Sequence, residues 1–144
     1  LLNGEDVTGL IRTPEVSMAT SACSAIPAVR AFLLQLQRDL AQRNNVLMDG
    51  RDFGTVVLPQ AQLKIFLTAS PEERARRRYL ELKEKGTEVS LEELEKRIAQ
   101  RDALDENREI SPLRCAEDAR YLDSTALSID QVTERIAAMA KEVL

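Results

Sequence analysis

The chain has 144 residues, a formal net charge of -4, 44% hydrophobic residues and 31% charged residues, which suits one globular domain with a hydrophobic core. No apolar run approaches the roughly 20 residues that span a bilayer, so we expect no membrane partner. The absence of histidine excludes a Ser–His–Asp triad, and with only two cysteines it leaves almost no ligands for a zinc site. The acidic charge and the scarcity of aromatic residues argue against nucleic-acid binding.

The two cysteines, Cys23 and Cys115, lie far apart, and the first residues lack the basic and apolar regions of a signal peptide. We therefore expect free thiols and a cytoplasmic protein. Residues 1–12 read as a strand end and a turn at Asn3-Gly4, and residues 14–43 as mainly helical. Apolar residues at helical spacing predict a core face on this helical segment: Val29, Phe32, Leu33, Leu36 and Leu40.

Three short apolar runs, at 46–48, 63–67 and 120–122, predict buried strands that each end in polar residues. Helical patterns lie between the second and third runs and after the third, which indicates a parallel α/β sheet. Ligands bind such sheets beyond the carboxyl ends of the strands. The polar residues that follow the first run are therefore candidates for a ligand-facing edge: Asp49, Arg51 and Asp52.

Helix boundaries are well marked in the second half of the chain. Three helix starts carry a serine followed three positions later by Glu or Gln, namely Ser70 with Glu73, Ser90 with Glu93 and Ser128 with Gln131. Gly86 is a natural helix end. In the last helix one apolar stripe indicates core packing: Ile129, Val132, Ile136, Met139 and Val143.

Charged residues continue an apolar stripe in the helix that starts at Ser90. Leu91, Leu94 and Ile98 mark its buried face, and the same rotation brings Arg101, Asp105 and Arg108 onto or near that face. Buried charges are costly unless they are paired. Either these groups face a charged ligand, or the helix end meets solvent, where Arg101 and Asp105 form an ordinary i, i+4 pair.

A second cluster, Arg74-Ala75-Arg76-Arg77-Arg78, puts four arginines within one and a half helical turns. Guanidinium groups bind phosphate in a two-pronged fashion, so phosphate is one candidate partner. The alternative is a solvated helix face that is balanced by neighbouring carboxylates: Glu72, Glu73, Glu81 and Glu84. A third feature is the Asp-Gly turn at 49–50, which suits a nucleotide site but also occurs in ordinary turns.

Several ordered motifs resemble the bacterial cytidylate kinase family over essentially the whole chain. They are Ile11-Arg12-Thr13, Ile26-Pro27-x-Val29-Arg30, Asp49-Gly50-Arg51-Asp52-x-Gly-Thr-Val-Val, Lys64-Ile65-Phe66-Leu67-x-Ala-Ser, Glu73-Arg74-Ala75-x-Arg77-Arg78, Arg101-Asp102-x-x-Asp105-x-Asn107-Arg108 and Leu122-Asp123-Ser124-Thr125. The resemblance implies a P-loop-kinase-like parallel sheet with flanking helices. It also implies transfer of the γ-phosphoryl group of ATP, with Mg²⁺, to CMP or dCMP, which belongs to pyrimidine metabolism.

The resemblance also implies roles for individual residues. Ser21, Arg30 and Asp52 would contact cytosine, Arg51 and Arg108 the acceptor phosphate, and Arg101 and Asp105 the sugar. Arg74, Arg77 and Arg78 would belong to a lid over ATP. Arg77, Arg51 and Asp49 would take part in catalysis, and no residue is expected to bind a metal directly.

The chain departs from the family pattern in one respect. None of its five glycines fits Gly-x-x-x-x-Gly-Lys, so we expect a C-terminal portion without the first strand, P-loop and first helix. We expect residues 1–144 to form one domain fragment, with the end of the CMP-binding insert and following helices at 1–45, a core at 46–144 and a lid near 71–110. Such a chain should be inactive alone, and another chain or a swapped element could fill the missing strand. The alternative function is a non-catalytic nucleotide-binding or interaction module.

Overall fold

The computed structural model describes residues 1–11, 13–24 and 26–143, without the side chains of Pro14, Glu15, Ser17, Met18 and Ser21. Contacts within the chain divide it into two compact units, Leu1–Leu47 and Met48–Leu144. Each unit is described by itself. The assignment of residues 1–45 to an insert and 46–144 to a core with a lid stays a prediction.

The first unit consists of a tight turn and two helices. Leu2 and Glu5 form an antiparallel bridge around the Asn3-Gly4 turn, where both residues have positive φ (50° and 90°). The helices α1 (Pro14–Ser24) and α2 (Pro27–Arg43) follow, and a proline at the start of α2 supplies the fixed φ of a first helical turn. The prediction of a mainly helical segment over 14–43 is therefore confirmed.

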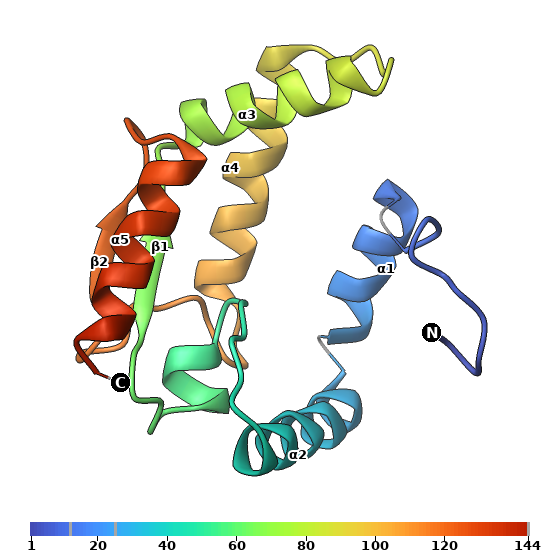
Figure 1. Ribbon diagram of the computed structural model, residues 1–144. Coiled ribbons are helices and arrows are strands. Elements are labelled where there is room, and N and C mark those ends of the chain that lie inside the picture. The colour runs from blue at the N-terminus through green and yellow to red at the C-terminus, as the bar shows by residue number, and fades with distance from the viewer. Residues whose placement is uncertain (12, 25, 144) are drawn as a thin grey trace. The chain divides into compact units, whose positions relative to one another are not determined.

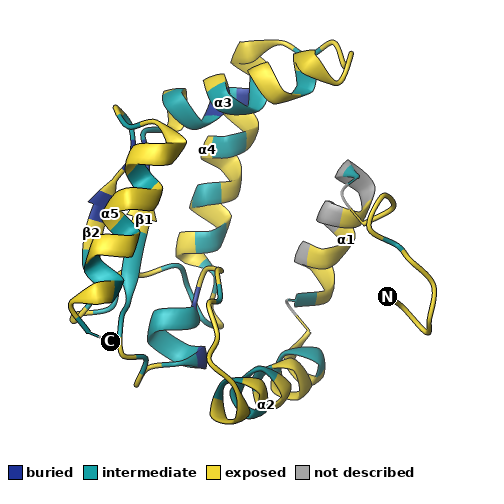
Figure 2. Cartoon of the chain, in the orientation of Figure 1, coloured by how far each residue is buried: buried dark blue, intermediate teal, exposed yellow. Residues whose placement is uncertain are grey.

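The predicted core face on α2 is wrong for this structure. The helix contains no buried residue, and Phe32 is 70% exposed. Leu33, Leu36 and Leu40 are exposed as well. Figure 2 shows α2 in the colours of exposed and intermediate residues. An apolar stripe predicts burial only where another element covers it, and the short helix α1, rich in Ser and Ala, leaves this stripe open.

The second unit is an α/β arrangement with two parallel strands and flanking helices. Strands β1 (Ile65–Thr68) and β2 (Arg120–Asp123) pair in register from Ile65 opposite Arg120 to Thr68 opposite Asp123. Between them in the chain lie α3 (Pro71–Glu84) and α4 (Leu91–Asn107), which pack against each other, and α5 (Ile129–Lys141) follows β2 (Figure 1). The predicted α/β class with a parallel sheet is confirmed, and the arrangement fits a truncated P-loop-kinase-like fold.

The strand predicted at 46–48 is wrong for this structure, because these residues have no regular structure. Val46 is 41% exposed and Leu47 96% exposed. A strand needs a hydrogen-bonded neighbour, and in the described part of the chain β1 pairs with β2 alone. The following residues instead form a π-helical turn, η1 (Phe53–Val57).

The predicted helix ends are confirmed. The hydroxyl groups of Ser70, Ser90 and Ser128 each accept a hydrogen bond from the backbone N–H three residues later. At Ser128 the side chain of Gln131 completes the capping box by accepting from the Ser128 N–H. Gly86 follows the end of α3 with φ of +73°, the left-handed conformation that favours glycine.

The core of the second unit is thin. Its buried apolar residues are small or medium in size: Val57, Ala69, Ala75, Leu94 and Leu122. The predicted core stripe on α5 is only partly correct, because Val132, Ile136, Met139 and Val143 are half-buried whereas Ile129 is 84% exposed. Val143 lies just beyond the end of α5, and in the described part of the chain the sheet has two strands.

Candidate functional site

The predicted buried face of α4 is only partly correct, because Leu91 is 40% exposed and Arg101 57% exposed, and Arg101 forms the i, i+4 pair with Asp105 that the solvated alternative expected. Leu94 is buried, and three turns later the side chain of Asp105 is 13% exposed. The Asp105 carboxylate accepts a hydrogen bond from Arg51 Nε at 2.8 Å and lies 3.9 Å from Arg101 Nε. The structure thus brings together three predicted substrate-binding residues, with the Asp105 carboxylate between Arg51 and Arg101. The side chains of these two arginines stay about half exposed, at 45% and 57%.

Arg108, just after α4, carries an incompletely satisfied guanidinium group. Its Nε donates a short hydrogen bond to the Ser111 carbonyl, and Ser111 has a positive φ of 52°. Its Nη2 is buried and has no hydrogen-bond partner among the described residues. Leaving a buried donor unpaired costs about 1–3 kcal/mol, and more for a charged group. An anionic oxygen would remove this cost.

Asp52, also a predicted substrate-binding residue, is only 8% exposed and opens the π-helical turn η1. Its carbonyl accepts hydrogen bonds from the N–H groups of Val56 and Val57, at 2.8 and 3.1 Å. Such π-turns are frequent at functional sites. Asp49 is exposed on the segment before this turn, and a Cβ on Gly50 would meet the Phe53 ring at 2.4 Å, so the turn requires glycine there.

The two other residues predicted to contact cytosine belong to the first unit. Arg30 lies on α2, is half-buried, and donates to the Ser24 carbonyl at 3.3 Å. Ser21 lies on α1, but its side chain is outside the described residues, as is Arg12 of the Ile11-Arg12-Thr13 motif.

The arginines of the predicted lid each have protein partners. Arg74 forms a two-pronged ion pair with Asp102 of α4 at 2.9 and 2.5 Å, which raises the pKa of Arg74. Arg78 pairs with Glu81 at 2.6 Å within α3. The carboxylates of α3 therefore balance part of the cluster, as the solvated-face interpretation expected.

Arg77 links α3 to the loop after β2. It donates from Nη2 to the carbonyl of Ser124 at 2.6 Å and from Nε to Glu73 at 2.8 Å. Ser124 is 4% exposed, and its hydroxyl donates to the Thr68 carbonyl, so the carboxyl ends of β1 and β2 are joined here. Hydrogen bonds from Arg76 and Arg77 lower the pKa of Glu73 from 4.5 to about 2.

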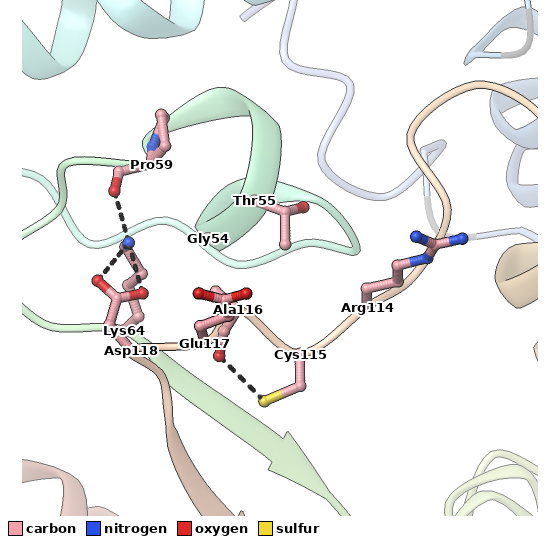
Figure 3. A pocket seen from close by; sticks show the side chains of 9 residues that line it. All are labelled: Gly54, Thr55, Pro59, Lys64, Arg114, Cys115, Ala116, Glu117 and Asp118. Atoms are coloured by element: carbon pink, nitrogen blue, oxygen red, sulfur yellow. Dashed lines mark hydrogen bonds and ion pairs between the residues drawn. The ribbon is translucent and has the colours of Figure 1, made fainter.

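Two partners at this site, Asp102 and Ser124, were not predicted as functional from the sequence. Both lie inside the family motifs quoted above, and this position in a motif was the sequence signal that could have identified them. A hollow of about 410 Å³ lies elsewhere in this unit, and none of the predicted site residues lines it. Lys64 is one of the residues that line it, and its ammonium group donates to the Pro59 carbonyl and to Asp118 (Figure 3).

The described residues do not fit a protein-held metal. They contain no cluster of three or more acidic or cysteine side chains that could hold an ion. Among the described residues, no helix combines the length and apolar character needed to cross a membrane.

Comparison with known proteins gives a consistent result. The model of the cytidylate kinase family matches residues 1–142. The chain is 57% identical over 136 residues to a cytidylate kinase of Carboxydothermus hydrogenoformans, covering 94% of this chain and 61% of that protein. It is 56% identical over 140 residues to one of Geobacter sulfurreducens, covering 97% of this chain and 60% of that protein.

A third relative, a cytidylate kinase of Caldicellulosiruptor saccharolyticus, is 55% identical over 144 residues, which are 100% of this chain and 64% of that protein. The chain thus spans about three fifths of the length of these relatives. The ordered motifs and the charged face of α4 agree with these matches, and the chain belongs to the cytidylate kinase family.

Proposed function

We propose that this chain supplies the nucleoside monophosphate site of an enzyme that transfers the γ-phosphoryl group of ATP to CMP or dCMP. The observation that carries the proposal is the arrangement around Asp105, with Arg108 presenting a buried Nη2 that lacks a partner among the described residues. A substrate phosphate offers the acceptor that this guanidinium lacks. Family membership supports the same reaction.

In this proposal the arginines and carboxylates divide the substrate between them. Arg51 and Arg108 hold the acceptor phosphate, and Arg101 with Asp105 holds the sugar. Asp52 recognises cytosine, because buried polar groups left unpaired by a wrong base give strong selectivity. That Ser21 and Arg30 contact cytosine stays a prediction from the family resemblance.

Phosphoryl transfer depends on positioning and on neutralising charge, so the lack of histidine is no obstacle. Arg77 and Arg78 act at the ATP side, where they would exchange their partners in α3 for phosphate oxygens. Asp49 and Arg51 stand on the segment that leads into η1, and in this proposal both act on the acceptor. None of the five glycines forms a P-loop motif, so we expect the 144-residue chain alone to make no CDP from ATP and CMP.

Calorimetric titration of the chain with CMP, UMP and AMP tests the proposal. We expect CMP to bind most tightly, and Asp52→Ala and Arg108→Ala each to weaken it by about tenfold or more, since each removes a charged hydrogen-bonding partner. Arg76→Ala is the matched control, because Arg76 pairs with Glu73 on its own helix. Equal, weak responses to all three nucleotides would contradict the proposal.

A further inference from the structure

One arginine of the cluster on α3 contacts the helix that carries the proposed monophosphate site. Arg74 donates from Nη1 and Nη2 to the two carboxylate oxygens of Asp102 on α4, at 2.9 and 2.5 Å. Its Nε donates to the carbonyl of the buried residue Ala69 at 3.0 Å. The side chains of Arg74 and Asp102 are 34% and 23% exposed, so this pair is partly shielded from water.

The other arginines of the cluster have partners of a different kind. Arg76 pairs with Glu73, and Arg78 pairs with Glu81, in both cases within α3. Arg77 reaches Glu73 and the loop after β2. The α3–α4 ion pair of Arg74 therefore sets it apart from its neighbours.

The position of Asp102 gives this contact a consequence for the site. Asp102 directly follows Arg101 and stands three residues before Asp105, so its contact lies within one turn of both. Arg74 is anchored at Ala69, immediately after β1. The pair thus ties the rotation of α4 to the end of the sheet, while Arg51 holds the same helix at Asp105.

We propose that Arg74 is a positioning residue for the monophosphate site, acting through Asp102, and does not serve mainly as a ligand of ATP. A two-pronged pair between planar groups fixes both distance and orientation, which a single hydrogen bond does not. Arg101 and Asp105 can then meet a sugar phosphate without first ordering the helix, and preorganisation of this kind increases affinity. The proposal rests on the function proposed above.

A double-mutant cycle tests it on the 144-residue chain with Arg74→Gln, Asp102→Asn and the double variant. We expect each single variant to weaken CMP binding about tenfold and the double variant to bind no more weakly than either, because both changes remove one interaction. Arg74→Lys keeps the charge but loses the two-pronged geometry and should fall between wild type and Arg74→Gln. Arg76→Gln, the matched control on α3, should bind CMP as wild type does.

A second readout does not depend on the ligand. The Nε–H of Arg51 donates to Asp105, so its NMR signal reports on the orientation of α4. We expect Arg74→Gln and Asp102→Asn to shift this signal in the same way, and Arg76→Gln to leave it unchanged. A wild-type chain that binds no CMP would contradict the proposed function. The NMR signal of Arg51 would still show whether Arg74 and Asp102 orient α4.

Three results would overturn the positioning role. The first is additive losses in the cycle. The second is a CMP affinity that Arg74→Gln and Asp102→Asn leave unchanged. The third is an Arg51 signal that none of the variants changes.

Discussion

At the scale of single residues, the second unit contains two kinds of arginine. Arg76 and Arg78 pair with carboxylates on their own helix, and both guanidinium groups stay exposed. Arg108 instead keeps a buried nitrogen without a partner among the described residues. Native proteins leave few such groups unexplained, and a missing ligand is one of the explanations. The difference in partners, not the density of arginine, distinguishes a binding group from a solvated face.

Glu73 gives a prediction at the same scale. Its pKa falls from 4.5 to about 2 through hydrogen bonds from Arg76 and Arg77, and that of Glu81 falls to about 2 through Lys85 and Arg78. A carboxylate with a lowered folded-state pKa stabilises the fold above its unfolded pKa, and this contribution is lost as pH falls from about 4.5 toward 2.

We therefore expect helix content, measured by circular dichroism between pH 6 and pH 2, to fall less steeply in Glu73→Gln and Glu81→Gln than in wild type. The double variant should be the least sensitive. Identical pH profiles in all four proteins would contradict the assigned ion pairs. All four proteins should be compared at one ionic strength, because exposed pairs are screened by salt.

At the scale of elements, the sequence predicts what is locally encoded. The starts of α3, α4 and α5 follow from serine caps, which satisfy N–H groups within four residues. The run at 46–48 has the composition of a strand, yet it forms none, because pairing depends on a neighbour that composition does not specify. Periodicity predicts the apolar stripe of α2 but not its exposure, because burial likewise depends on a neighbouring element.

In the charged site, too, local features could be predicted from the sequence, whereas contacts between distant residues could not. The neighbouring positions of Arg101 and Asp105 on α4, and the low exposure of Asp105, could be predicted from helical periodicity. That Arg51, 54 residues away, would be the closest partner of Asp105 could not be read from spacing. The pairing of Arg74 with Asp102, 28 residues apart, was equally hidden, because two helices must first pack before such a contact exists.

At the scale of the whole molecule, more large apolar side chains are exposed than buried. Among the described residues the buried apolar side chains are few and none is larger than leucine, whereas the exposed large side chains include Phe32, Leu47, Leu67, Tyr121 and Ile129. In the described part of the chain β1 pairs along one edge only, which leaves backbone groups open at the other. Both features favour association with another chain or segment.

We accordingly expect the chain on its own to self-associate or to unfold over a broad temperature range. Analytical ultracentrifugation combined with a thermal melt measures both properties. Phe32→Ser should reduce self-association without lowering the melting midpoint, because the side chain is already 70% exposed. Leu122→Ser, at a buried position of β2, is the contrasting variant and should destabilise the fold. A sharp melt of a verified monomer would argue against this expectation.

The idea that a nucleotide phosphate completes Arg108 is tested most directly by comparing CMP with cytidine on wild type and on Arg108→Gln, by calorimetry. The account predicts that wild type prefers CMP by about tenfold or more and that Arg108→Gln loses most of this preference while still binding cytidine as wild type does. An undiminished preference for CMP in Arg108→Gln would contradict it, because the phosphate would then have its partners elsewhere.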